Sequence, residues 1–194
     1  MRVFGTFALT ALLACGTSMP ANAQKPAGPN ATDAALGPMA ATIRNRVGEW
    51  EVQAKLQFTP KTRPVVIHAR ATSRLLGDRW LITEFTDESR DPAMPSFAGL
   101  GVNGYDPDQR HYVGYWVDSS RGLAIPVTGE YDPKSGVFRT VSVERQRNGK
   151  SVTVVSETRS VDANTEQTTF TAPDADGRPF VRMQMTYTRA QPTR

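Results

Sequence analysis

The stretch Gly48–Phe58, with the sequence GEWEVQAKLQF, alternates apolar and polar side chains with a period of two. The intervening residues are charged or carry side-chain amides, and the apolar set is Trp50, Val52, Ala54, Leu56 and Phe58. This alternation predicts a β-strand that is buried on one face and wet on the other. In a helix, at about 100° per residue, the same positions would be spread around the cylinder. The stretch is therefore expected to be the first strand of an all-β domain.

Residues 1–23 have the features of an export signal. Arg2 is the positive n-region, Val3–Ala14 is the apolar h-region, and Ala21–Ala23 is a small-x-small cleavage site. The apolar run is shorter than the roughly 20 residues that a membrane span needs. We therefore expect a periplasmic or secreted protein without a membrane span.

The only cysteine suggests an alternative cellular location. Leu12-Leu13-Ala14-Cys15-Gly16 also resembles a bacterial lipobox. If it is used, Cys15 carries a lipid anchor and the protein is an outer-membrane lipoprotein. If cleavage follows Ala23 instead, the mature chain contains no cysteine. In either case no disulfide can form within the chain.

The segment 24–38, rich in Ala, Pro, Gly and Asn, has no apolar period and is expected to be a flexible linker. In Met39–Val47, apolar residues recur at i, i+4 and i+8, which predicts a short amphipathic helix ended by Gly48. Such a helix would cap one end of a barrel. The folded domain is predicted to span residues 39–190.

Beyond the first strand, β-branched and aromatic runs alternate with turn signals at a spacing of about 8 to 12 residues, which is typical of an all-β meander. The further strands are predicted near Val65–Leu76, Arg79–Thr86, Phe97–Tyr105, His111–Asp118, Leu123–Tyr131, Val137–Arg147, Ser151–Val161, Gln167–Ala172 and Phe180–Arg189. Roughly ten strands with short connections either close into a single antiparallel up-and-down barrel or form two packed sheets. Pro126 is the one proline inside a predicted strand, and we expect a β-bulge there.

The last predicted strand ends on an arginine that shares the inward parity of Met183, Met185 and Tyr187. If the first and last strands are neighbours, Arg189 can place its guanidinium over the indole of Trp50, a contact worth about 0.5 to 2 kcal/mol. The alternative is an Arg189 side chain frayed into solvent.

Gly48-x-Trp50 at the start of the first strand and Arg189 at the end of the last resemble the structural signature of the calycins, the lipocalin-like barrels. More specifically, the chain resembles a bacterial family, domain of unknown function fifteen-seventy-nine. The resemblance rests on the order of short motifs: Gly48-Glu49-Trp50, Phe97-Ala98-Gly99, Gly104-Tyr105-Asp106, Tyr115-Trp116-Val117-Asp118-Ser119, Gly129-Glu130-Tyr131-Asp132 and Tyr187-Thr188-Arg189. It implies a lipocalin-like barrel with structural roles for Gly48, Trp50 and Arg189, and it supplies no catalytic residues. The chain has Thr42-Ile43 where the family usually has a histidine.

The leading functional prediction is a non-enzymatic binding protein with a small, largely apolar ligand in the barrel. The residues expected to line the ligand site are Val52, Leu56, Phe58, Tyr115, Trp116, Met183, Met185 and Tyr187. Two alternatives remain open: an enzyme that acts near Asp118, and a structural protein whose barrel is filled by side chains. Asp118-Ser119, with no Gly-x-Ser-x-Gly in the chain, is interpreted as turn chemistry.

Other candidate motifs point to no cofactor or metal. Gly99–Gly104 has the form GxGxxG, but Tyr105-Asp106-Pro107 prevents the helix that a dinucleotide site needs. These glycines are expected to allow strand curvature or the close approach of a neighbouring backbone. His68 and His111 have no partners at metal-ligand spacing. The formal net charge of +4 comes from scattered residues, so no nucleic-acid partner is predicted.

Overall fold

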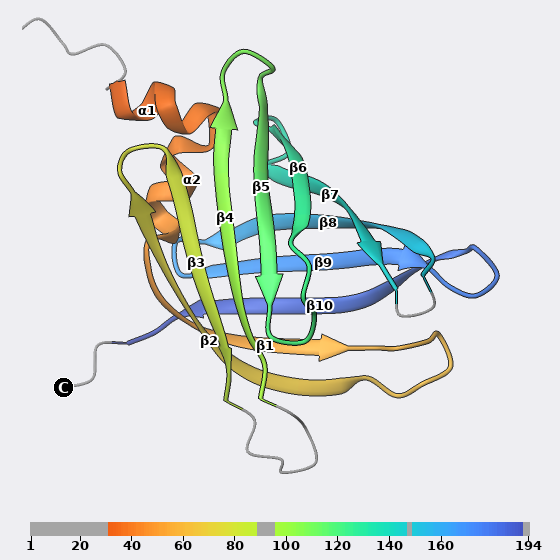
Figure 1. Cartoon of the computed structure of the whole chain (residues 1–194). Coiled ribbons are helices and arrows are strands. Elements are labelled where there is room, and N and C mark those ends of the chain that lie inside the picture. Colours follow the sequence, from red (N-terminus) through yellow and green to blue (C-terminus); the bar gives the residue numbers. More distant parts are fainter. Residues whose placement is uncertain (1–30, 89–95, 147–148, 192–194) are drawn as a thin grey trace, which may run out of the picture.

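The computed structural model describes residues 31–88, 96–146 and 149–191. In this part of the chain, ten antiparallel strands follow one another around a closed barrel, and the last strand pairs with the first (Figure 1). The strands are β1 Gly48–Leu56, β2 Val65–Leu76, β3 Trp80–Asp87, β4 Ala98–Asp106, β5 His111–Asp118, β6 Ile125–Asp132, β7 Val137–Arg145, β8 Ser151–Asp162, β9 Thr165–Pro173 and β10 Pro179–Arg189. The predicted up-and-down barrel is confirmed, and the two-sheet alternative is wrong.

Pairing between β1 and β10 closes the barrel in a continuous register from Trp50 opposite Arg189 to Leu56 opposite Met183. The bulge expected at Pro126 is absent, because β5 and β6 pair without a shift in register. Pairing of β6 with β7 begins only at Val127, so the missing N–H of Pro126 costs no bond in that ladder. Register shifts occur instead in β10, between Val181 and Met183, and in β8, between Ser160 and Asp162.

Three short helical segments precede the barrel: α1 Ala31–Leu36, the 3-10 turn η1 Gly37–Met39 and α2 Ala40–Arg46. The helix predicted before the first strand is therefore present. The linker prediction fails for residues 31–38, because Leu36 is buried against the barrel at 1% exposure. The hydroxyl of Tyr112 on β5 fixes this segment, since it accepts from the backbone N–H of Met39 at 2.7 Å and donates to the carbonyl of Leu36 at 2.9 Å.

The helices close one end of the barrel, which we call the helix end (Figure 1). There Leu36, Met39 and Ile43 pack with Leu81 and Tyr112 in one buried cluster. Because β1 starts at this end, the turns after β1, β3, β5, β7 and β9 lie at the opposite end, the far end. A second, larger cluster lines the strands on both sides of β1 and comprises Trp50, Val52, Ala54, Ala69, Ala71, Phe85, Met185 and Tyr187.

Two predictions concern residues outside the described ranges. The predicted export signal at residues 1–23 and the alternative lipid anchor at Cys15 both lie before Ala31, the first residue that the structure describes. Within the described ranges, no helix is both long and apolar enough to cross a membrane.

Candidate functional site

The interior of the barrel is the candidate site, and its wall has two chemically different sides. On β1, β2, β3 and β10 most inward side chains are apolar, with one hydroxyl pair, Ser73 and Thr83 at 2.9 Å, among them. We call this side the apolar wall, formed by Val52, Ala54, Ala69, Ala71, Phe85 and Met185. It follows from the alternation in these strands, since every second residue is small or apolar and points inward.

On β7, β8 and β9 many positions of the same inward parity carry hydroxyl groups, although Phe138, Val154 and Phe170 have this parity too. We call this side the hydroxyl wall, formed by Thr140, Ser142, Ser156, Thr158 and Thr168. Two pairs bond across strands: Thr140 with Ser156 at 2.6 Å, and Thr158 with Thr168 at 2.9 Å. A bond between two hydroxyls uses one O–H, so each pair keeps a second O–H and several lone pairs for another partner.

Several inward-facing side chains remain partly exposed although they lie halfway along strands of a closed barrel. Thr140, Ser142 and Thr158 belong to the hydroxyl wall. Val127 on β6 lies directly opposite Ser142 in the β6–β7 ladder, and Asn103 is an inward residue of β4. A side chain inside a barrel can be exposed only to space inside it. The helix end is closed by its own buried cluster.

A charged pair lies where the two walls meet at the helix end. Arg46, at the end of α2, donates through Nη1 to Oε2 of Glu166 on β9, and its guanidinium carbon is 4.6 Å from the ring centroid of Tyr187. The Glu166 side chain is 1% exposed and that of Arg46 is 18% exposed. Among the described residues, the other carboxylate oxygen of Glu166, Oε1, has no hydrogen-bond partner. Burial raises the pKa of Tyr187, which therefore stays neutral beside the pair.

Aromatic rings gather at the far end. Phe85, Phe97 and Trp116 contact one another with ring centroids 5.9 to 6.5 Å apart. The indole N–H of Trp116 donates to Asp118 at 3.0 Å. This bond fixes the Trp116 ring at the edge of the apolar wall.

The hydrogen bonds of Asp118 are those of a turn. Its carboxylate accepts from the backbone N–H of Ser120 at 2.9 Å and lies 3.3 Å from Nε of Arg121. Ser119 accepts from the backbone N–H of Ala98 at 3.0 Å. The interpretation of Asp118-Ser119 as turn chemistry is therefore confirmed, and both Asp118 oxygens are engaged by neighbours rather than directed at a substrate.

Two residues predicted to line the interior lie outside it. Tyr115 is 57% exposed, because it has the opposite parity to its neighbour Trp116 and two successive residues of a strand cannot face the same side. Phe58 is 58% exposed, because β1 ends at Leu56 and the alternation does not continue beyond it.

The other predicted lining residues have inward parity. Val52, Met185 and Tyr187 are buried. Trp116 and Met183 are partly buried and pack against the same cluster, and Leu56, the last residue of β1, is partly buried opposite Met183.

Arg46 and Glu166 were missed by the sequence analysis. The predicted ninth strand began at Gln167, which left Glu166 in a turn, whereas β9 begins at Thr165. The available signal was parity: Glu166 alternates with Thr168, Phe170 and Ala172, which point inward. A glutamate with the parity of an inner face needs a cationic partner.

The glycines of the GxGxxG segment make room for aromatic rings. A Cβ on Gly99 would lie 2.2 Å from Cζ2 of Trp116, and one on Gly104 would lie 2.5 Å from Cε3 of Trp80. Close approach was predicted, but the approaching groups are side chains of the adjacent strands rather than backbone. The whole segment lies in strand β4 and does not lead into a helix, whereas a dinucleotide site needs a helix directly after the glycines.

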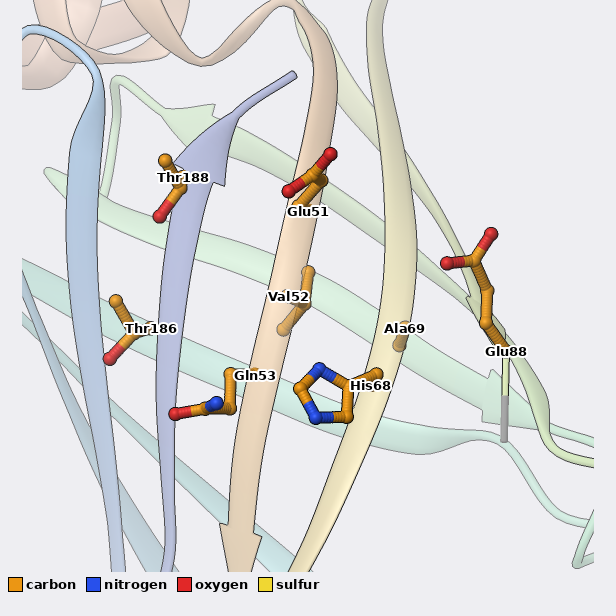
Figure 2. Close-up of a pocket in the computed structure, with 8 residues that line it drawn as sticks. All are labelled: Glu51, Val52, Gln53, His68, Ala69, Glu88, Thr186 and Thr188. Atoms are coloured by element: carbon orange, nitrogen blue, oxygen red, sulfur yellow. The ribbon is translucent and has the colours of Figure 1, made fainter. Parts of the chain in front are cut away.

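A hollow of about 370 Å³ lies on the outer face of β10, β1 and β2. Figure 2 shows the side chains of Gln53, His68, Thr186 and Thr188 around it, with Glu51 and Glu88 at its edge. These are the outward, wet positions of the strands, and His68 is exposed as predicted. The described part of the chain holds no group of three side chains that could bind a metal ion.

The fold and site together define a closed ten-strand up-and-down β-barrel with a helix-capped end and a two-sided interior. The chain belongs to the family described as "Protein of unknown function (DUF1579)", whose sequence profile matches residues 37–189. The family resemblance read from the motifs is therefore confirmed. No curated protein sequence matches the chain.

One solved structure shows the same kind of fold. The crystal structure of Rv2717c from M. tuberculosis aligns with a TM-score of 0.60 at 14% identity, covering 80% of this chain and 99% of that one. A redesigned β-barrel aligns at 0.40 and 9% identity, covering 77% and 95% of the two chains. A Nostoc punctiforme protein of the DUF3598 family aligns at 0.23 and 8% identity, covering 80% and 100%. At such identities the likeness to Rv2717c concerns the fold alone, and the two weaker alignments add nothing to it.

Proposed function

We propose that this protein is a non-enzymatic binding protein that holds a small, largely apolar ligand inside its barrel. One observation carries the proposal: inward side chains such as Thr140, Ser142 and Val127 stay partly exposed within a closed barrel. A barrel filled by its own side chains would bury these positions. A barrel of about eight strands is wide enough to be filled by side chains or to hold one small ligand, and the diameter grows with the number of strands.

We expect the ligand to contact the partly buried residues at the edge of the apolar wall. Met183 and Trp116 have inward parity and are incompletely covered. A thioether adapts its shape to different apolar partners, and an indole offers a large apolar face. Val52, Met185 and Tyr187 lie behind them and give this side its shape.

We also propose that the protein works outside the cytoplasm, in the periplasm or beyond, because residues 1–23 have the pattern of an export signal. Processing at Cys15 would instead tether the barrel to the outer membrane. Mass spectrometry of the mature N-terminus after expression in a bacterial host separates the two: a chain beginning at Gln24 supports release, and a lipidated Cys15 supports anchoring.

Two variants test binding inside the barrel. Ser142→Phe adds bulk to the partly exposed inner position on β7, whereas Val143→Phe makes the matched change on the outer face of the same strand, where Val143 is 53% exposed. The readouts are native mass spectrometry of protein purified from its host and displacement of the neutral fluorescent probe phenylnaphthylamine.

We expect saturable displacement by apolar compounds for the wild type and for Val143→Phe, and loss of displacement for Ser142→Phe with thermal stability retained. The absence of any co-purified mass together with the absence of saturable probe binding would contradict the proposal and favour a filled, structural barrel. Equal loss in both variants would place binding outside the barrel.

A further inference from the structure

The charged pair at the helix end of the barrel is incompletely satisfied. Glu166 has inward parity and is almost fully buried, yet only Oε2 has a partner, the Nη1 of Arg46. A buried carboxylate oxygen without a partner is costly, because it has lost water and gained no donor. A bound group that donates a hydrogen bond would remove this cost.

Arg46 offers the complementary half of the site. A guanidinium has five N–H donors; Nη1 donates to Glu166, and the side chain also interacts with the Tyr187 hydroxyl, which leaves further donors. The Arg46 side chain is 18% exposed, against 1% for that of Glu166. The site thus combines a free acceptor with spare donors next to each other.

The Arg46–Glu166 pair has no net charge, and the inward charges named below are engaged by other partners. Arg189 is occupied by Trp50 and by the carbonyls of Asn45 and Val47. Asp118 and Glu144, at the far end, both contact Arg121. An anionic head group would meet the carboxylate of Glu166 and could not donate to it, and an ammonium would meet Arg46 and could not accept from it. A hydroxyl can do both.

We infer that the ligand is a neutral amphipathic molecule whose hydroxyl group binds between Arg46 and Glu166 while its apolar chain runs along the apolar wall toward the far end. This inference rests on the proposed function and adds the chemistry of the head group. The hydroxyl wall supports it, because the spare O–H groups of the Thr158–Thr168 and Thr140–Ser156 pairs extend from this site along the interior.

The test compares dodecanol, dodecanoate and dodecylamine as competitors of phenylnaphthylamine. The three share one chain, so differences between them report on the head group. For the wild type we expect dodecanol to displace the probe at about tenfold lower concentration than either charged competitor, as expected for one well-made hydrogen bond to a charged group. Displacement by all three at equal concentration would overturn the inference and leave the proposed function standing, whereas displacement by none would overturn both.

Two charge-removing variants sharpen the test. Glu166→Gln leaves Arg46 without its counter-charge. Dodecanoate should therefore displace the probe at a lower concentration, relative to dodecanol, than it does in the wild type. Arg46→Gln leaves the Glu166 carboxylate unpaired. Dodecylamine should therefore displace the probe at a lower concentration, relative to dodecanol, than it does in the wild type. The matched control is Glu144→Gln, the same substitution at an inward glutamate that pairs with Arg121 at 3.2 Å at the far end, and the order of the competitors should not change.

An unchanged order in both variants would overturn the inference, and so would the same change in the Glu144→Gln control. Circular dichroism establishes that each variant is folded. If one of the pair does not fold, the wild-type order of the three competitors decides the matter by itself.

Discussion

The guanidinium carbon of Arg189 lies 4.4 Å from the ring centroid of Trp50, so the last strand of the barrel is joined to the first through a cation–π contact. Arg189 also donates to the carbonyl of Val47 at 3.2 Å and to that of Asn45, and the Trp50 indole donates to the carbonyl of Arg46 at 2.8 Å. The two side chains therefore fasten α2, β1 and β10 together where the barrel closes. The frayed arginine considered from the sequence is wrong.

Removing either member of this pair should destabilise the fold. Trp50→Ala is expected to cost about 3 to 5 kcal/mol, as for other large aromatic truncations in cores. Arg189→Ala should cost less, about 1 to 2 kcal/mol, for the lost contact and hydrogen bonds. Because the residues touch, the double variant should lose less than the sum. Urea unfolding measures all three, and strictly additive losses would show that the contact contributes nothing.

Gly99→Ala should destabilise by about 1 to 3 kcal/mol, the usual cost of overpacking. The added methyl would lie 2.2 Å from Cζ2 of Trp116, whose ring is held by its bond to Asp118. The matched control is Gly122→Ala, since nothing lies within 4 Å of the position of its Cβ. Thermal unfolding should separate the two variants, and equal stabilities would mean that Trp116 moves aside freely.

Stability should fall at high pH through Tyr112. Burial raises the pKa of this phenol to about 12, although the N–H of Met39 opposes the shift. Below pH 10, the ordinary pKa, the hydroxyl is neutral in both the folded and unfolded chains, and the contribution is fully present. Between pH 10 and about 12 the unfolded chain releases a proton that the folded one keeps, so stability is lost as the pH rises.

Tyr112→Phe removes this titration, and its unfolding free energy should therefore fall less steeply than that of the wild type over the same pH range. The exposed Tyr115→Phe is the control and should keep the wild-type slope. Identical slopes for all three proteins would mean that Tyr112 ionises as easily in the folded chain as in the unfolded one.

Asp118→Asn should lower stability by about 1 to 3 kcal/mol, because the Asp118 carboxylate holds the turn between β5 and β6 through Trp116, Ser120 and Arg121. Its side chain is 2% exposed, so lost partners are not replaced by water. Asp176→Asn, at a turn position that is 73% exposed, should change little. Unchanged stability in Asp118→Asn, together with loss of a measurable activity, would favour the enzyme hypothesis.

The barrel was predictable because nearly every strand carries its own signal of period two, bounded by Gly, Pro, Asn and Asp turns. The closure was predictable too, since Trp50 and Arg189 share inward parity at the two ends of the domain. The helix α1 was not, because its burial depends on Tyr112, 76 residues from Leu36 in the chain, and no local period marks that contact.

The candidate site was predictable only in part, for physical reasons. The apolar wall follows from alternation, which places Val52, Met185 and Tyr187 inside. Parity was also enough to exclude Tyr115 once Trp116 was assigned to the interior. The pairing of Arg46 with Glu166 could not be foreseen, because it joins the end of a helix to a strand 120 residues later, and only the closed fold brings them together.

The most direct test of binding inside the barrel uses the three tryptophans as position markers. Trp50 and Trp116 have inward parity, whereas Trp80 is on the outer face and 37% exposed. The measurement is the fraction of tryptophan fluorescence quenched at saturation by a brominated dodecanol. We predict that this fraction is larger in Trp80→Phe than in the wild type and smaller in Trp116→Phe. The opposite order, or quenching that does not saturate, would contradict a ligand site in the barrel interior.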